Sequence, residues 1–129
     1  ACLRLLSYLE RKGQKLSQLV AELPKYISSP EIKFGLADEI KFKFISEIIT
    51  KEFKQQWPDA EYIDIDGIRM DLPDQMAIIR ASQNGPYATV KFEAKTQVGY
   101  DNLKKILKGI LSKYTEIDLQ KGTNIEALD

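Results

Sequence analysis

A short polar tract at residues 80–86 combines the residue types that bind a phosphate group. It contains a guanidinium at Arg80, a hydroxyl at Ser82, amides at Gln83 and Asn84, and a glycine at position 85. An arginine fork donates two parallel hydrogen bonds to an oxyanion, and hydroxyl and amide groups add further donors. Gly85 would let consecutive backbone N–H groups converge on one anion. The tract therefore predicts a phosphate-binding loop.

The same tract is also typical of an ordinary polar hairpin loop. In that interpretation Asn84-Gly85 serves turn geometry and Arg80 is a solvated strand residue. Apolar strand patterns at 76–80 and 87–94 flank the tract in both interpretations. The tract is thus expected at a hairpin tip, where its donors face solvent.

Alternating apolar residues predict the sheet that holds this hairpin. Asp66-Gly67 favours a tight two-residue turn, and Pro73-Asp74 predicts the next reversal of the chain. The segments with strand character are 62–65, 68–72, 76–80 and 87–94. They predict a four-stranded antiparallel meander.

Two helices are expected to cover this sheet. Asp38 is a candidate N-cap for a helix that ends before Trp57. Its apolar positions are Phe42, Ile45, Ile49 and Phe53. The second helix has apolar positions at Leu103, Ile106, Leu107, Ile110, Leu111 and Tyr114. The sequence therefore predicts an α+β domain.

The chain divides into four parts by its pattern. Residues 1–25 form two short apolar stripes, broken after Gly13 and ended by Pro24, that are too small for a core of their own. Residues 26–36 are expected to be a hinge or linker with a brief strand, residues 37–114 the main domain, and residues 115–129 an irregular tail. Because the helical pattern starts at Ala1, we expect the chain to be a fragment.

Composition excludes several classes of function. Nineteen basic residues balance nineteen acidic ones, so no net field attracts nucleic acid or an anionic membrane. The chain has no histidine, which removes the commonest general base and metal ligand, and one cysteine, Cys2, which cannot form an internal disulfide. No apolar stretch reaches the length of a membrane span. A cytoplasmic location is expected.

Three other groups of residues are weaker candidates for a site. Four turn carboxylates are expected to be solvated and not a cation site: Asp64, Asp66, Asp71 and Asp74. Four lysines are expected to form the solvated face of the last helix: Lys104, Lys105, Lys108 and Lys113. An RNA platform built on Tyr62, Tyr87 and Phe92 lacks the glycine-aromatic signature.

Taken in order, several motifs resemble the C-terminal part of the α-D-phosphohexomutases, the phosphomannomutase and phosphoglucomutase enzymes. The motifs are LSQLVAELP at 16–24, DGIRM at 66–70, Arg80-Ala-Ser82 followed by Pro86, and FEA at 92–94. The resemblance runs from Ala1 to about Tyr114. Residues 1 to about 25 match the last helices of domain three, and the following residues match domain four.

The resemblance implies a TBP-like domain, a four-stranded antiparallel sheet with two helices on one face. It implies a four-domain enzyme that interconverts hexose 1-phosphates and 6-phosphates, with a phosphoserine in domain one and magnesium in domain two. This fragment is then expected to be inactive alone, with no catalytic residue, no metal ligand and no cofactor of its own. Its partners would be the missing domains and a phosphorylated hexose.

By position, the resemblance makes four residues the ligands of the non-reacting phosphate: Arg80, Ser82, Gln83 and Asn84. Gly85, whose backbone would let N–H groups converge, completes the predicted site. The domain would close the active site, with residues 24–36 as the hinge. The chain departs from the family pattern because it lacks the threonine of the loop. The alternative is a non-catalytic module that binds phosphosugars or a protein partner. The sugar, whether mannose, glucose or phosphoglucosamine, is not readable from this stretch.

Overall fold

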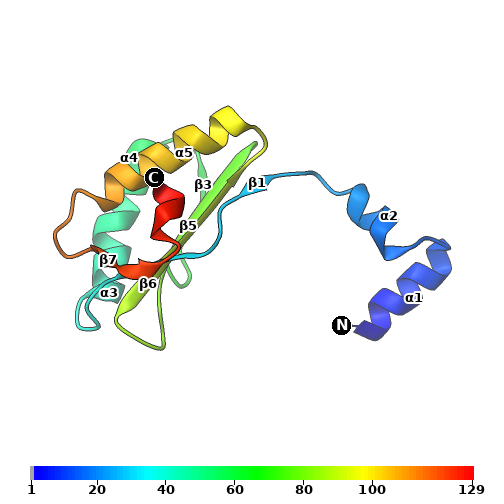
Figure 1. Cartoon of the computed structure of the whole chain (residues 1–129), viewed down its shortest axis with the longest axis horizontal. Coiled ribbons are helices and arrows are strands. Elements are labelled where there is room, and N and C mark those ends of the chain that lie inside the picture. Colours follow the sequence, from blue (N-terminus) through cyan, green and yellow to red (C-terminus); the bar gives the residue numbers. More distant parts are fainter. Residues whose placement is uncertain (1) are drawn as a thin grey trace.

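Seven strands form one antiparallel sheet in the computed structural model, which describes residues 2–129 (Figure 1). The strands are β1 (Ile27–Ser28), β2 (Ile32–Gly35), β3 (Glu61–Ile63), β4 (Ile68–Leu72), β5 (Gln75–Ala81), β6 (Tyr87–Ala94) and β7 (Asp118–Thr123). Their order is β3-β4-β5-β6-β2-β7, and β1 pairs with β6 beyond the end of β2.

The predicted meander is present as strands β3 to β6, but the prediction of a four-stranded sheet is wrong. Strand β2 pairs with β6 in the register Ile32↔Val90, so it extends the sheet beyond the meander. Strand β7 then pairs with β2. The tail that was predicted to be irregular thus contains this strand and a 3-10 helix, η2 (Ile125–Leu128). Strand β7 has a polar sequence, so its pairing depends on partners far away in the chain.

Two helical segments pack on one face of the sheet. The first is continuous and consists of α3 (Lys41–Lys43), a π-helical stretch η1 (Phe44–Ile49) and α4 (Thr50–Gln56); the second is α5 (Gln97–Leu111). The first segment begins after Ile40 without a side-chain cap, so the expected N-cap role of Asp38 is wrong. The α5 helix is capped by the Thr96 hydroxyl, which accepts the Gly99 N–H at 3.1 Å.

The core lies between these helices and the inner face of the sheet. Alternate residues of β5 and β6 point into it, for example Ile79 and Val90, which are fully buried. The helices contribute Ile45, Ile49, Phe53, Leu103, Leu107 and Leu111. Phe42, expected in the same apolar stripe, is instead 51% exposed, whereas Lys41 before it and Phe44 after it are buried.

The N-terminal segment lies apart from the sheet domain (Figure 1). It holds α1 (Cys2–Lys12) and α2 (Leu16–Ala21), and neither helix buries a residue. Ala1, the first residue of the expected 1–25 segment, lies outside the described residues. Leu6 and Leu23 are about 60% exposed, so this apolar surface is not covered by the rest of the chain.

Within residues 2–129, every helix is too short or too polar to cross a lipid bilayer.

Candidate functional site: an anion-binding loop

Arg80 lies near the end of β5 and points away from the core. Its neighbour Ile79 is fully buried, and successive residues of a strand face opposite sides of the sheet. The guanidinium Nη2 of Arg80 donates a hydrogen bond to Oδ2 of Asp66 at 2.6 Å. Both side chains are more than half exposed, at 52% and 54%. An exposed pair of this kind contributes little to stability and opens easily.

The loop after β5 turns tightly and keeps donors free. The Ser82 backbone N–H donates to the carbonyl of Tyr87 at 2.9 Å, and the Ser82 hydroxyl accepts the Asn84 N–H at 3.1 Å. The side chains of Gln83 and Asn84 are exposed. In the described chain, the backbone N–H groups of Gln83 and Gly85 have no protein acceptor. Two backbone donors are therefore available to a ligand.

Gly85 does not have the conformation expected for an anion nest. Among the described residues, the glycines with positive φ are Gly13 and Gly67, and Gly85 is not one of them. A β-carbon at Gly85 would lie 3.0 Å from Cε1 of Tyr87. The position is therefore restricted by the Tyr87 ring, which packs against the loop backbone.

A buried lysine holds the base of the loop. Lys41 is 4% exposed, and its ammonium group donates to the carbonyl oxygen of Gly85 at 2.8 Å and to Oδ1 of Asp38 at 2.5 Å. The Leu36 N–H donates to the carbonyl of Pro86 at 3.0 Å. The loop is thus tied both to the start of the first helical segment and to the end of β2.

Asp66 reaches Arg80 from a neighbouring loop whose shape differs from the sequence prediction. Strand β3 ends at Ile63 and β4 starts at Ile68, so a four-residue loop replaces the expected two-residue turn. Gly67 has φ +148°, and a β-carbon there would lie 2.2 Å from the carbonyl oxygen of Ile79. Glycine therefore lets loop 64–67 lie directly against the end of β5.

The sheet face opposite the core, which we call the open face, carries basic residues that the sequence analysis did not select. On the central strands this face includes Lys33, Arg69, Ile78, Arg80, Thr89 and Lys91, together with the acidic Asp71 and Glu93. Lys33 pairs with Thr89, and Thr89 pairs with Arg80, so these three residues form one row across the sheet. Only long-range strand pairing brings Lys33 to this row, and no local signal could have found it.

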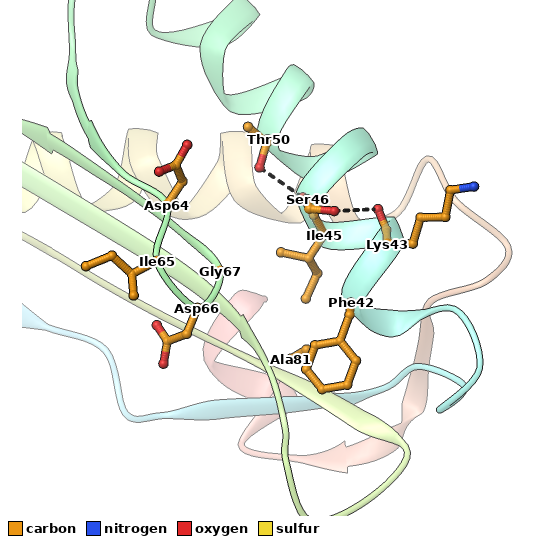
Figure 2. Close-up of a pocket in the computed structure, with 10 residues that line it drawn as sticks. All are labelled: Phe42, Lys43, Ile45, Ser46, Thr50, Asp64, Ile65, Asp66, Gly67 and Ala81. Carbon is orange, nitrogen blue, oxygen red and sulfur yellow. Dashed lines mark hydrogen bonds between the residues drawn. The ribbon is translucent and has the colours of Figure 1, made fainter.

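A pocket of about 370 Å³ lies between the first helical segment, loop 64–67 and the end of β5 (Figure 2). It is lined by residues of the first helical segment, of loop 64–67 and by Ala81. The Ser46 and Thr50 hydroxyls donate to backbone carbonyls of their own helix, at 3.2 and 3.0 Å. Lys43 extends away from the other lining residues (Figure 2). The pocket therefore offers mainly hydrogen-bond acceptors, which do not suit a phosphate.

Two of the four turn carboxylates take part in ion pairs. Asp66 pairs with Arg80, and Asp71 accepts two hydrogen bonds from Arg69 at 2.6 and 2.7 Å. This pairing raises the pKa of the Arg69 guanidinium. Within residues 2–129, no three acidic or cysteine side chains converge on a possible metal position.

Three of the four lysines that were expected to be solvated on the last helix contact other parts of the chain. Lys108 pairs with the carboxylate of Asp129 at 2.7 Å, and Lys104 donates to the backbone carbonyl of the same residue. Lys113, just beyond the helix, pairs with Glu52 at 2.6 Å. These contacts join the C-terminal residue that follows η2 to α5, and the first helical segment to the end of α5.

Relatives of the chain in sequence are hexose phosphate mutases. It is 34% identical over 117 residues to a phosphomannomutase/phosphoglucomutase of Pseudomonas syringae pv. tomato, which covers 90% of this chain and 24% of that protein. It is 32% identical over 97 residues to a phosphoglucomutase of Neisseria gonorrhoeae, covering 74% and 20%. A probable phosphoglucosamine mutase of Pyrococcus furiosus is 31% identical over 101 residues, covering 78% and 22%.

The chain thus spans about a quarter or less of the length of these relatives. A crystal structure of a phosphoglucomutase/phosphomannomutase family protein from Burkholderia thailandensis matches the fold with a TM-score of 0.55 and 24% identity. The match covers 75% of this chain and 19% of that one. No protein-family model matches the chain.

Proposed function

We propose a function from the premise that this chain is homologous to a segment of the phosphomannomutase/phosphoglucomutase proteins. In this proposal it is the phosphate-binding domain of an enzyme that moves a phosphoryl group between the 1- and 6-positions of a hexose. The domain binds the phosphate that does not react and closes the active site. The phosphoryl transfer itself takes place on other parts of the longer protein.

The observation that carries the proposal is the position of Arg80 beside the free donors of its loop. One edge of the guanidinium binds Asp66, and its remaining N–H groups are free for an oxyanion. The backbone N–H groups of Gln83 and Gly85 lie in the following turn. Together these groups supply charge and direction, so the chain contributes positioning and charge neutralisation.

The anchoring of the loop also supports this role. Lys41 and Leu36 hold the backbone at Gly85 and Pro86 from two different elements. A loop held in one shape loses less conformational entropy when it binds a ligand. The sugar ring and the second phosphate would then be held by the other domains.

Titration of the ¹⁵N-labelled chain with inorganic phosphate and with glucose 6-phosphate tests the proposal. We expect the largest amide shifts at residues 82–85, and Arg80→Ala should weaken phosphate binding roughly tenfold or more. Arg11→Ala, in the exposed α1, is the matched control and should leave the affinity unchanged. Shifts located elsewhere, or equal affinities for Arg80→Ala and the unmodified chain, would overturn the proposal.

The alternative, a non-catalytic module that binds phosphosugars, predicts the same titration. The two differ in the activity of the longer protein. Phosphomutase activity that is present in the longer protein and lost on Arg80→Ala supports the enzyme, whereas binding without activity supports the module.

A further inference from the structure

We propose that Lys33 is a second cationic ligand of the same anion, although it lies 47 residues before Arg80 in the chain. This inference rests on the proposed function, because it deepens the description of the same site. It arises from the pairing of strands β2, β6 and β5.

The register places Lys33 in the row of Arg80. Lys33 lies opposite Thr89 on β6, and Thr89 lies opposite Arg80 on β5. Neighbouring strands are about 4.8 Å apart, so the two Cα atoms are separated by roughly 10 Å. Once the exposed pair of Arg80 with Asp66 opens, the long side chains of Lys33 and Arg80 can both reach an anion held above Thr89. On the same face, Tyr87 and its partner Gly35 lie one row nearer the loop, whereas Lys91 lies one row further away.

Alternation of burial shows that Lys33 and Arg80 share a face. Ile32, Val90 and Ile79 are paired in the adjacent row and are all fully buried. The residues that follow them, or precede them on β6, must therefore face the opposite side. Lys33 is part-exposed and Arg80 is exposed, as expected for the open face.

The ammonium group of Lys33 is held in position without being neutralised. It lies 5.1 Å from the centroid of the Tyr87 ring, within the range of a cation–π contact. The same ring packs against Gly85 of the loop. Among the described residues, no carboxylate lies within ion-pair distance of Lys33. A part-exposed cation without a counter-ion beside the loop is available to a bound anion.

Loop 82–86 has no charged side chain, so a cation from a neighbouring strand would add to its binding of an anion. Loop 82–86 offers the hydroxyl of Ser82 and the amides of Gln83 and Asn84, so its donors carry no charge. A charged donor on the neighbouring strand would strengthen the binding of a phosphate dianion, because charge-assisted hydrogen bonds are roughly twice as strong as neutral ones. The side chain that completes the site thus comes from β2 and not from the loop.

Variants of the full chain titrated with inorganic phosphate test the inference. We expect Lys33→Met to raise the phosphate dissociation constant roughly five- to tenfold and to flatten its dependence on salt. Lys33→Arg should keep most of the affinity. Lys105→Met, an exposed lysine of α5, is the matched control and should change neither quantity.

Tyr87→Leu provides a second, independent measurement. It removes the ring under the ammonium group but keeps the charge, so we expect an intermediate loss of about two- to threefold. Thermal unfolding of each variant shows whether the domain is intact. If Arg80→Ala abolishes binding while Lys33→Met has no effect, the inference fails and the proposed function stands. If the unmodified chain binds no phosphate, the proposed function itself fails.

Discussion

Lys41 and Gly85 are joined by a hydrogen bond of 2.8 Å between a buried ammonium group and a backbone carbonyl oxygen. The lysine side chain is only 5% exposed, and its counter-ion, Asp38, is 56% exposed. A charged group is buried at a cost unless it is paired and hydrogen-bonded. This contact therefore couples the start of the first helical segment to the loop that carries the proposed site.

Lys41→Met is expected to loosen this loop. The change removes the charged donor and leaves the Gly85 carbonyl without its strongest partner, so the free energy of unfolding should fall by roughly 1–3 kcal/mol. Urea denaturation measures this loss, and amide exchange at residues 82–86 should become faster. Lys41→Arg, which keeps a charged donor, is the control. A Lys41→Met chain as stable as the original would show that the contact has no energetic role.

Asp66→Asn is expected to strengthen phosphate binding. Asp66 competes with the ligand for the Arg80 guanidinium, and the amide removes the competing charge. Because the pair is exposed, stability should change by less than about 1 kcal/mol, while phosphate affinity should rise roughly two- to fivefold. Titration monitored by NMR gives the affinity, and Asp59→Asn, in an exposed turn, is the control. Weaker binding would mean that Asp66 positions the arginine instead of competing for it.

Gly67→Ala is expected to displace loop 64–67. A β-carbon at this position would lie 2.2 Å from the Ile79 carbonyl and 3.0 Å from the Arg80 Cα, and φ is +148°. The loss of stability should exceed about 2 kcal/mol, and the Arg80 pair with Asp66 should break. Gly109→Ala, at an exposed position of α5 where a β-carbon would meet nothing within 4 Å, should instead stabilise the domain by roughly 0.5–1 kcal/mol. Chemical denaturation of both variants distinguishes these outcomes.

The pair formed by Glu52 and Tyr114 is expected to give two pH-dependent contributions to stability. The Tyr114 hydroxyl donates to Glu52 at 2.7 Å, and Lys113 donates to the same carboxylate at 2.6 Å. These hydrogen bonds, that of Lys113 first, lower the pKa of Glu52 below 4.5, and the contact with Glu52 raises the pKa of Tyr114 from 10.0 to about 12.

Both contributions stabilise the fold, but they depend on pH in opposite directions. For Glu52 the folded pKa is below the unfolded one, so its contribution is present above pH 4.5 and is lost as the pH falls through the lower folded pKa. For Tyr114 the contribution is present below pH 10.0 and is lost as the pH rises through about 12. Tyrosine ring ¹³C shifts should show a late titration of Tyr114 that Glu52→Gln moves towards 10.0. An unchanged midpoint would exclude the carboxylate as the cause.

A chain that starts at residue 26 is expected to fold like the full chain. Neither α1 nor α2 buries a residue, so their removal takes no side chain from the core. The free energy of unfolding should change by less than about 0.5 kcal/mol, and the phosphate affinity should be the same. Amide spectra of the two chains give the comparison. Large shifts within strands β4 to β6 would show that the N-terminal segment supports the sheet.

Local patterns were sufficient for the elements in the middle of the sheet. Strands β4, β5 and β6 follow the alternation of apolar residues that defines them, and α5 follows its apolar stripe. The position of Arg80 at the exposed end of a strand followed from the same alternation, because side-chain direction in a strand depends only on the local backbone.

Tertiary structure decided the rest, because it depends on pairs of residues that are distant in sequence. Strand β7 has a polar sequence and forms only because it pairs with β2. Lys41 is buried where its ammonium group binds the carbonyl oxygen of Gly85, 44 residues away in the chain. Arg80 pairs with Asp66 because Gly67 lets loop 64–67 lie against the end of β5. The sequence shows which residue types in the chain are able to bind an anion. The fold alone determines which of them, such as Lys33, lie in the same place.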